Sequence, residues 1–109
     1  MFKSKIIGMG YSVPENIITN HDLSKIMDTS DDWIQSRSGI KERRWATDNV
    51  TTSDLAYEAC KQTIENSKIN PIDIDMIIVG TLSSDYFFPG VSAQLQEKLN
   101  LKNLDQIIF

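Results

Sequence analysis

The sequence predicts an α/β fold, and three observations lead to that prediction. Apolar runs of strand length alternate along the 109 residues with segments whose apolar side chains recur at helical spacing. The run Met76–Gly80 is apolar on both faces, as in the buried strands of parallel sheets. Turn-forming residues separate the runs. The expected order is strand, two short helices, extended arm, long helix, strand, helix and strand.

In the first third of the chain, the apolar run Lys5–Met9 predicts a strand, and the turn-forming cluster 10–16 predicts a loop. A short helix is expected over 21–27, because its apolar residues lie at helical spacing after Thr19 or Asn20.

A second helix is expected over 30–38. Either Thr29 or Ser30 supplies the N-cap oxygen, and two aspartates follow in the first turn, where the helix dipole favours anions. Gly39 stands just past the last turn and stops the helix. The stretch Ile40–Trp45 then predicts an edge strand or an extended arm.

The longest helix is expected to begin at Thr51 or Thr52, with an apolar stripe that reaches Ile64 before Pro71 forbids continuation. A later helix is expected to have Pro89 at its first position. Its apolar residues recur at every fourth position, at Val91, Leu95 and Leu99.

The last run, Asp105–Phe109, begins another apolar strand. A chain that finishes inside such a strand exposes backbone groups and apolar side chains that a complete domain covers. We therefore expect residues 1–109 to be the front part of one larger domain.

The composition excludes several classes of protein. With 40% hydrophobic and 24% charged residues, the chain has an ordinary globular composition. No apolar run approaches the roughly 20 residues needed to span a bilayer, and no signal-peptide core follows the amino terminus. The single cysteine suits a reducing compartment. We expect a cytoplasmic protein without a membrane anchor.

Positive charge is concentrated in one stretch, although the chain is acidic overall. The formal net charge of −4 argues against a nucleic-acid binder. The basic stretch 37–44 nevertheless has a net charge of +3, from Arg37, Lys41, Arg43 and Arg44 against Glu42. This asymmetry is compatible with a small polyanionic ligand and equally with a solvated surface.

Trp33 and Arg37 are the candidate binding residues. Four positions apart on the expected helix, they share a face on which an indole and a guanidinium can hold one flat ligand between them. The guanidinium can also fork onto a phosphate. A nucleotide-like ligand suits this pair. The alternative is a half-buried tryptophan packed on the core and an arginine in a surface ion pair.

Neither His21 nor Cys60 is a candidate for chemistry. The histidine has no partner histidine or cysteine nearby, so a surface or capping role is expected. The cysteine lies on the apolar stripe of the long helix, where a thiol is ordinarily a small core hydrophobe.

Three adjacent aromatic residues, Tyr86, Phe87 and Phe88, lie on a loop expected between 83 and 90. They either fold under the loop as core or form an exposed patch for a partner subunit or an apolar ligand.

Taken together, the chain resembles the amino-terminal third of a β-ketoacyl-acyl-carrier-protein synthase III, a condensing enzyme of the thiolase fold. The resemblance covers nearly all of the chain. It rests on Ile6–Gly10, Pro14, Thr19–Leu23, Asp28–Ile34, Arg37–Arg43 and Phe88–Pro89 ahead of Gln94–Gln96. It implies an incomplete amino-terminal half of a thiolase-like αβαβα fold with a mixed, mostly parallel sheet.

The resemblance also implies roles for four residues. In that family the tryptophan of the Asp28–Trp33 motif stacks on the adenine of coenzyme A, the arginine four residues later contacts the same nucleotide end, and the motif's threonine lines the entrance. These roles fall on Trp33, Arg37 and Thr29. The phenylalanine before the proline, here Phe88, is implied to cross a homodimer interface and close the partner's acyl pocket.

The implied reaction is acyl transfer from acyl-CoA and then decarboxylative Claisen condensation with malonyl-acyl-carrier protein, which begins fatty-acid synthesis. The family's catalytic cysteine, histidine and asparagine fall beyond Phe109, so no catalytic residue is expected in this chain. His21 and Cys60 do not replace them. Acyl-CoA enters as a substrate, and neither a tightly bound cofactor nor a metal is expected.

Two alternatives remain open. A related enzyme of the same fold condenses two acyl-CoA molecules or primes polyketide synthesis. A non-catalytic coenzyme A-binding module holds the nucleotide without any reaction.

Overall fold

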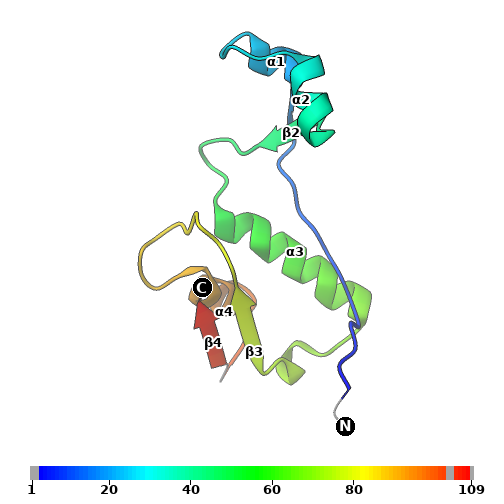
Figure 1. Ribbon diagram of the computed structural model, residues 1–109. Coiled ribbons are helices and arrows are strands. Elements are labelled where there is room, and N and C mark those ends of the chain that lie inside the picture. The colour runs from blue at the N-terminus through cyan, green and yellow to red at the C-terminus, as the bar shows by residue number, and fades with distance from the viewer. Residues whose placement is uncertain (1–2, 103–104, 109) are drawn as a thin grey trace. The chain divides into compact units, whose positions relative to one another are not determined.

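The computed structural model describes residues 3–102 and 105–108, and the chain forms two compact units (Figure 1). One unit joins Met1–Ser12 to Thr51–Phe109, and the other is Val13–Val50. Each has a two-stranded sheet of its own, one antiparallel and one parallel. The described residues therefore form an α/β structure, but not the single mixed sheet that was expected. A single domain over 1–109 stays a prediction.

The unit Val13–Val50 is an antiparallel strand pair that carries two helices. Strand β1 (Asn16–Thr19) pairs with β2 (Glu42–Trp45). Helix α1 (Asn20–Ser24) follows β1 directly, and α2 (Asp31–Ser38) precedes β2. Of the two structures predicted after α2, an edge strand or an extended arm, the strand is confirmed over Glu42–Trp45.

Both helices of this unit begin at side-chain caps. Thr19 Oγ1 accepts the Asp22 N–H at 3.1 Å, and the Asp22 carboxylate accepts the Thr19 N–H in return. Ser30 Oγ accepts the Trp33 N–H at 3.1 Å. Gly39 ends α2 with a φ of 72°, a left-handed conformation that favours glycine. The sequence signals for α2 are confirmed.

The other unit is built on helix α3 (Thr52–Ser67). A short turn, η1 (Pro71–Asp73), leads from α3 to strand β3 (Met76–Val79). Helix α4 (Val91–Lys98) then joins β3 to β4 (Asp105–Ile108), and the two strands pair in parallel. Helix α4 packs against α3 and against both strands.

The apolar core of this unit is small. Its buried apolar residues among those described are Val91, Leu95 and Leu101. Strand β3 is not buried on both faces, as its apolar sequence had predicted, because Ile78 is 62% exposed. Cys60 is half-buried and lines an apolar cavity of about 300 Å³, where burial raises the pKa of its thiol.

The segment predicted as the first strand, Lys5–Met9, pairs with no described strand. The end of the segment meets α3 instead (Figure 1), where Asn66 Nδ2 donates to the Met9 carbonyl at 3.0 Å. The approach is close enough that a Cβ on Gly10 would lie 2.4 Å from the Ala59 carbonyl oxygen. The prediction failed because a helix has no free ladder of backbone groups with which a strand can pair.

Two helix boundaries also differ from the prediction. Helix α4 begins at Val91 rather than at Pro89, because Gly90 takes the N-cap position. Helix α1 ends at Ser24, whereas the apolar spacing had suggested 27. None of the helices in the described part of the chain combines the length and apolar character that crossing a bilayer requires.

Candidate functional site

Helix α2 presents Trp33 and Arg37 on one accessible face. Trp33 is 55% exposed, and Arg37 Cζ lies 4.7 Å from the centroid of the indole. This is a cation–π distance. The spacing of four residues therefore placed both side chains on one face, as predicted. Trp33 is not enclosed in an apolar core, and its binding role stays a prediction.

The contact between these two side chains changes the expected geometry. A flat ligand between them needs a contact gap of about 3.5 Å on each of its faces, or about 7 Å in total. The observed 4.7 Å leaves no such gap. The guanidinium already covers one face of the indole, so the predicted sandwich is wrong. Because Trp33 is 55% exposed, part of the indole stays accessible to a stacked ring.

Thr29 is partly buried and stands immediately before Ser30, the N-cap residue of α2. The capping role that the sequence allowed for either residue belongs to Ser30. The contact of Thr29 with coenzyme A stays a prediction.

A buried amide organises the unit that carries this helix. Asn20 is the only buried residue in 13–50, all of which the structure describes. Its Nδ2 donates to Asp31 Oδ1 at 2.7 Å and to the Ile40 carbonyl at 2.8 Å, and its Oδ1 accepts from Arg43 Nη2 at 2.6 Å. Both amide protons and the amide oxygen therefore have partners. We call Asn20, Asp31 and Arg43 the Asn20 hub.

The Asn20 hub joins all four elements of its unit. Asn20 is the first residue of α1, Asp31 is the first residue of α2, and Arg43 lies in β2. Arg43 Nη1 also donates to the Ile18 carbonyl of β1 at 3.1 Å. Through this network, α2 and its candidate binding face are connected to the other three elements of the unit.

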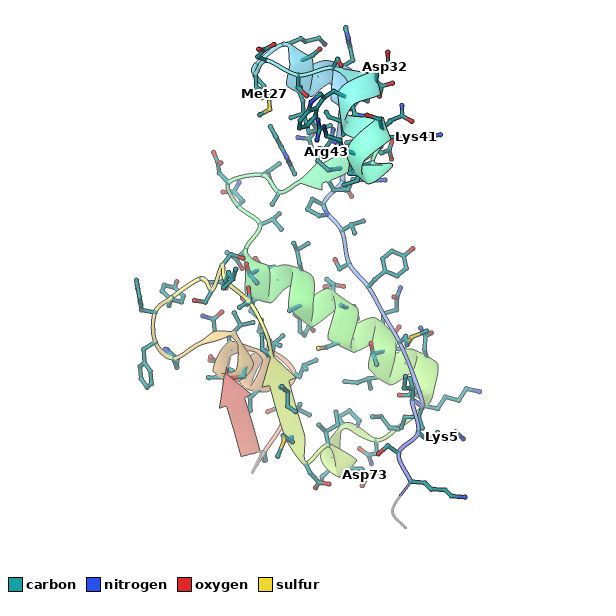
Figure 2. All side chains as sticks on the ribbon, viewed as in Figure 1. Lys5, Met27, Asp32, Lys41, Arg43 and Asp73 are labelled. Carbon is teal, nitrogen blue, oxygen red and sulfur yellow. The ribbon has the colours of Figure 1, made fainter. Side chains whose placement is uncertain are left out.

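The positive charge of the basic stretch is largely committed to internal contacts. In Figure 2, Arg43 lies within the helix cluster, whereas Lys41 lies at its margin. Arg44 Nη1 donates to the Pro14 carbonyl at 3.2 Å. Arg37 covers Trp33. The polyanion surface suggested by the charge count is therefore smaller than four cations, because two of the arginines bind backbone or side-chain oxygens of their own unit.

Asp31 carries a negative charge at the start of α2. Its hydrogen bond from Asn20, then the one from Gln35 Nε2 at 2.7 Å, and the charge of Lys41 lower the pKa of this carboxyl. A carboxylate at this position also interacts favourably with the helix dipole. The helix thus has an anion at its first residue and the Arg37 cation in its last turn.

The aromatic loop belongs to the other unit. Phe88 is 86% exposed, and Phe87 is exposed completely, so in the described structure they do not fold under the loop as core. The loop is nevertheless anchored, because the Asp85 carboxylate accepts the Ser53 N–H at 3.2 Å in the first turn of α3. Exposed aromatic rings on an anchored loop fit an interaction surface.

No family model matches the chain. Among curated relatives, the β-ketoacyl-acyl-carrier-protein synthase III of Listeria monocytogenes is 53% identical over 98 residues, which are 90% of this chain and 31% of the relative. This chain matches the amino-terminal portion of a β-ketoacyl-acyl-carrier-protein synthase III. The synthase III of Fusobacterium nucleatum is 52% identical over 99 residues, or 91% of this chain and 30% of the relative. The chain spans about a third of the length of these curated relatives.

Solved structures give the same result for the fold. The synthase III of Aquifex aeolicus superposes with a TM-score of 0.91 and 40% identity, covering 96% of this chain and 34% of that one. A priming β-ketosynthase of the R1128 polyketide pathway has a TM-score of 0.90 at 24% identity, over 96% of this chain and 31% of that one, a likeness of fold alone. The described structure is therefore part of a thiolase-like α/β fold.

Sequence reasoning missed the Asn20 hub. The sequence indicates Asn20 only as a helix start and Arg43 only as a surface charge. The partners of Asn20 lie 11 and 23 residues away along the chain, so no local period connects them. The one available signal was that all three residues fall within the stretches that carry the family resemblance.

Proposed function

We propose that this chain is the coenzyme A-entrance part of a synthase III. The full-length protein transfers an acyl group from acyl-CoA to its own cysteine and condenses it with malonyl-acyl-carrier protein, which initiates fatty-acid synthesis. The observation that supports this most strongly is the exposed Trp33, backed by Arg37 and held by the Asn20 hub, in a chain 53% identical to a synthase III. The complete αβαβα fold with a mixed sheet belongs to the same proposal.

In this proposal the open face of the Trp33 indole stacks on the adenine of coenzyme A. Arg37 lies behind the ring at 4.7 Å and directs its remaining N–H groups toward the phosphates, which a guanidinium binds in a fork. Thr29 lines the same entrance. Acyl-CoA is a substrate here, and the cysteine, histidine and asparagine of the reaction come from outside residues 1–109.

Replacing Trp33 tests this proposal. In the full-length protein, Trp33→Ala should weaken coenzyme A binding by about 1–3 kcal/mol, the size of one base–aromatic stacking contact. The matched control is Trp45→Ala, which removes the indole of β2 that is 43% exposed. Isothermal titration with coenzyme A measures both. An unchanged dissociation constant for Trp33→Ala would remove the proposed role.

Phe88 is proposed to cross a homodimer interface and to close the acyl pocket of the partner subunit. Its 86% exposure on an anchored loop supports this. Phe88→Ser should weaken the dimer in sedimentation and shift the preferred acyl chain length, whereas Leu82→Ser, at a fully exposed position of the same loop, should change neither. An unaltered chain-length profile for Phe88→Ser would contradict the role.

A second candidate keeps the fold and changes the reaction. A priming β-ketosynthase has the same fold at a TM-score of 0.90, so the fold by itself does not separate the two reactions. The full-length protein, given acyl-CoA with either malonyl-carrier protein or a second acyl-CoA, separates the two reactions by its product.

A non-catalytic coenzyme A-binding module predicts instead that the 109-residue chain is monomeric, folds cooperatively and binds coenzyme A with no turnover.

A further inference from the structure

We propose that Asn20 is a positioning residue for the nucleotide end of coenzyme A, because its side-chain amide clamps both ends of α2 and so sets the direction that Trp33 and Arg37 face. The inference rests on the function proposed above. Asn20 acts through Asp31, Ile40 and Arg43 and not by contact with the ligand.

Few other contacts fix the orientation of helix α2. None of its residues is buried, so apolar packing contributes little to holding it. One nitrogen, Asn20 Nδ2, donates to Asp31 at the first residue of α2 and to the Ile40 carbonyl just past Gly39, which ends it. The start and the exit of the helix are thus tied to a single group.

The direction of the helix matters because it determines where the indole points. Successive residues of an α-helix point about 100° apart, so each side chain faces one direction only. If α2 rotates about its own axis, the exposed surface of Trp33 turns away from the ligand. The Arg37 guanidinium, 4.7 Å from the ring, turns with it because both belong to α2. A loosened clamp therefore affects stacking and phosphate contact together.

Only an amide meets all the requirements of this position. Its nitrogen supplies two donors, for Asp31 and Ile40, and its oxygen supplies the acceptor for Arg43. A carboxylate in its place has no proton for either acceptor and repels Asp31. An apolar side chain removes all three hydrogen bonds that Asn20 makes with Asp31, Ile40 and Arg43.

The test is the kinetics of Asn20→Asp in the full-length protein. The KM for acyl-CoA should rise about tenfold, on the scale of losing a hydrogen bond to a charged group, with kcat nearly unchanged. A general loss of folded enzyme would instead lower the apparent kcat and leave KM unchanged. The matched control is Asn16→Asp, the same chemical change at an exposed position of β1, which should leave both constants unchanged.

A second change provides the rescue. Combining Asn20→Asp with Asp31→Asn exchanges the amide and the carboxylate, so the bond between the two positions forms again while the carboxylate faces Arg43. The KM should then fall by about threefold from that of the single variant, because only the bond to Ile40 stays broken. A double variant with a KM no better than that of Asn20→Asp would overturn the inference.

Two further variants keep the outcome clear. Asn20→Ser retains a hydroxyl in a smaller side chain, so it should raise KM in the same direction even if Asn20→Asp does not fold; a wild-type KM for Asn20→Ser contradicts the proposal. Trp33→Ala separates this inference from the function on which it rests. If Trp33→Ala raises KM and the Asn20 variants do not, the positioning role of Asn20 is wrong while the proposed function stands. If Trp33→Ala has no effect, both fail.

Discussion

The two compact units of this chain are stabilised in opposite ways. Val13–Val50 surrounds one buried amide and has no buried apolar residue, whereas the described part of the other unit buries Val91, Leu95 and Leu101. Apolar burial is non-directional, while hydrogen bonds require defined distances and angles. The unit that carries the candidate binding face is therefore the one whose geometry depends on directional contacts.

This difference predicts where substitutions are tolerated. A small apolar core accepts changes that keep its volume, because any packing of similar density excludes water equally well. A polar network does not, since removal of one member breaks hydrogen bonds whose distances and angles no other side chain reproduces. In the proposed binding unit, the same hydrogen bonds that fix the orientation of α2 also make it less tolerant of substitution.

The largest effect is expected in the apolar unit. Leu95 is 2% exposed, and Leu95→Ala should lower the free energy of unfolding of the full-length protein by about 2–5 kcal/mol through lost burial and a cavity. Leu95→Met, which nearly conserves volume, should cost less than about 1.5 kcal/mol. Urea denaturation measures both. An equal loss of unfolding free energy for Leu95→Ala and Leu95→Met would show that this core tolerates substitution no better than the polar network does.

A smaller effect is expected from the polar unit, where two neighbouring arginines form a matched pair. Arg43 donates from Nη1 to Ile18 and from Nη2 to Asn20, which one ammonium cannot reproduce, so Arg43→Lys should cost about 1–2 kcal/mol. Arg44 uses Nη1 alone for its backbone contact with Pro14, and Arg44→Lys should cost less than about 0.5 kcal/mol. If Arg43→Lys and Arg44→Lys lost similar unfolding free energy in urea denaturation, the directional hydrogen bonds of the Asn20 hub would not contribute as proposed.

The smallest effect concerns acid stability and the one ion pair of the described apolar unit. Lys98, then the capping bonds of Thr51, hold the pKa of Asp54 well below its ordinary 3.8. The stabilisation from this carboxylate is therefore complete above that value and is lost as the pH falls below it toward the lowered pKa. Asp54→Asn should reduce the acid dependence of the melting temperature between about pH 5 and about pH 2. If the melting temperatures of the wild type and of Asp54→Asn fell equally with pH, the prediction would be contradicted.

The site was predictable from the sequence only as far as its local parts. The cap at Ser30 and the stop at Gly39 placed α2 correctly, and the spacing of Trp33 and Arg37 gave their shared face. The sandwich geometry was wrong, because spacing does not say whether two side chains leave room for a third group or contact each other. The burial of Asn20 was not predictable from its surroundings in the sequence.

By itself, the sequence determined the α/β class, the start and end of α2 and the side of that helix on which an indole and a guanidinium lie, because caps and helical period act within a few residues. Two outcomes came from long-range contacts instead: Lys5–Met9 forms no paired strand and meets α3 at Met9, and Arg43 binds a buried amide. Those outcomes depend on contacts between residues 23 or more positions apart, which no local pattern contains.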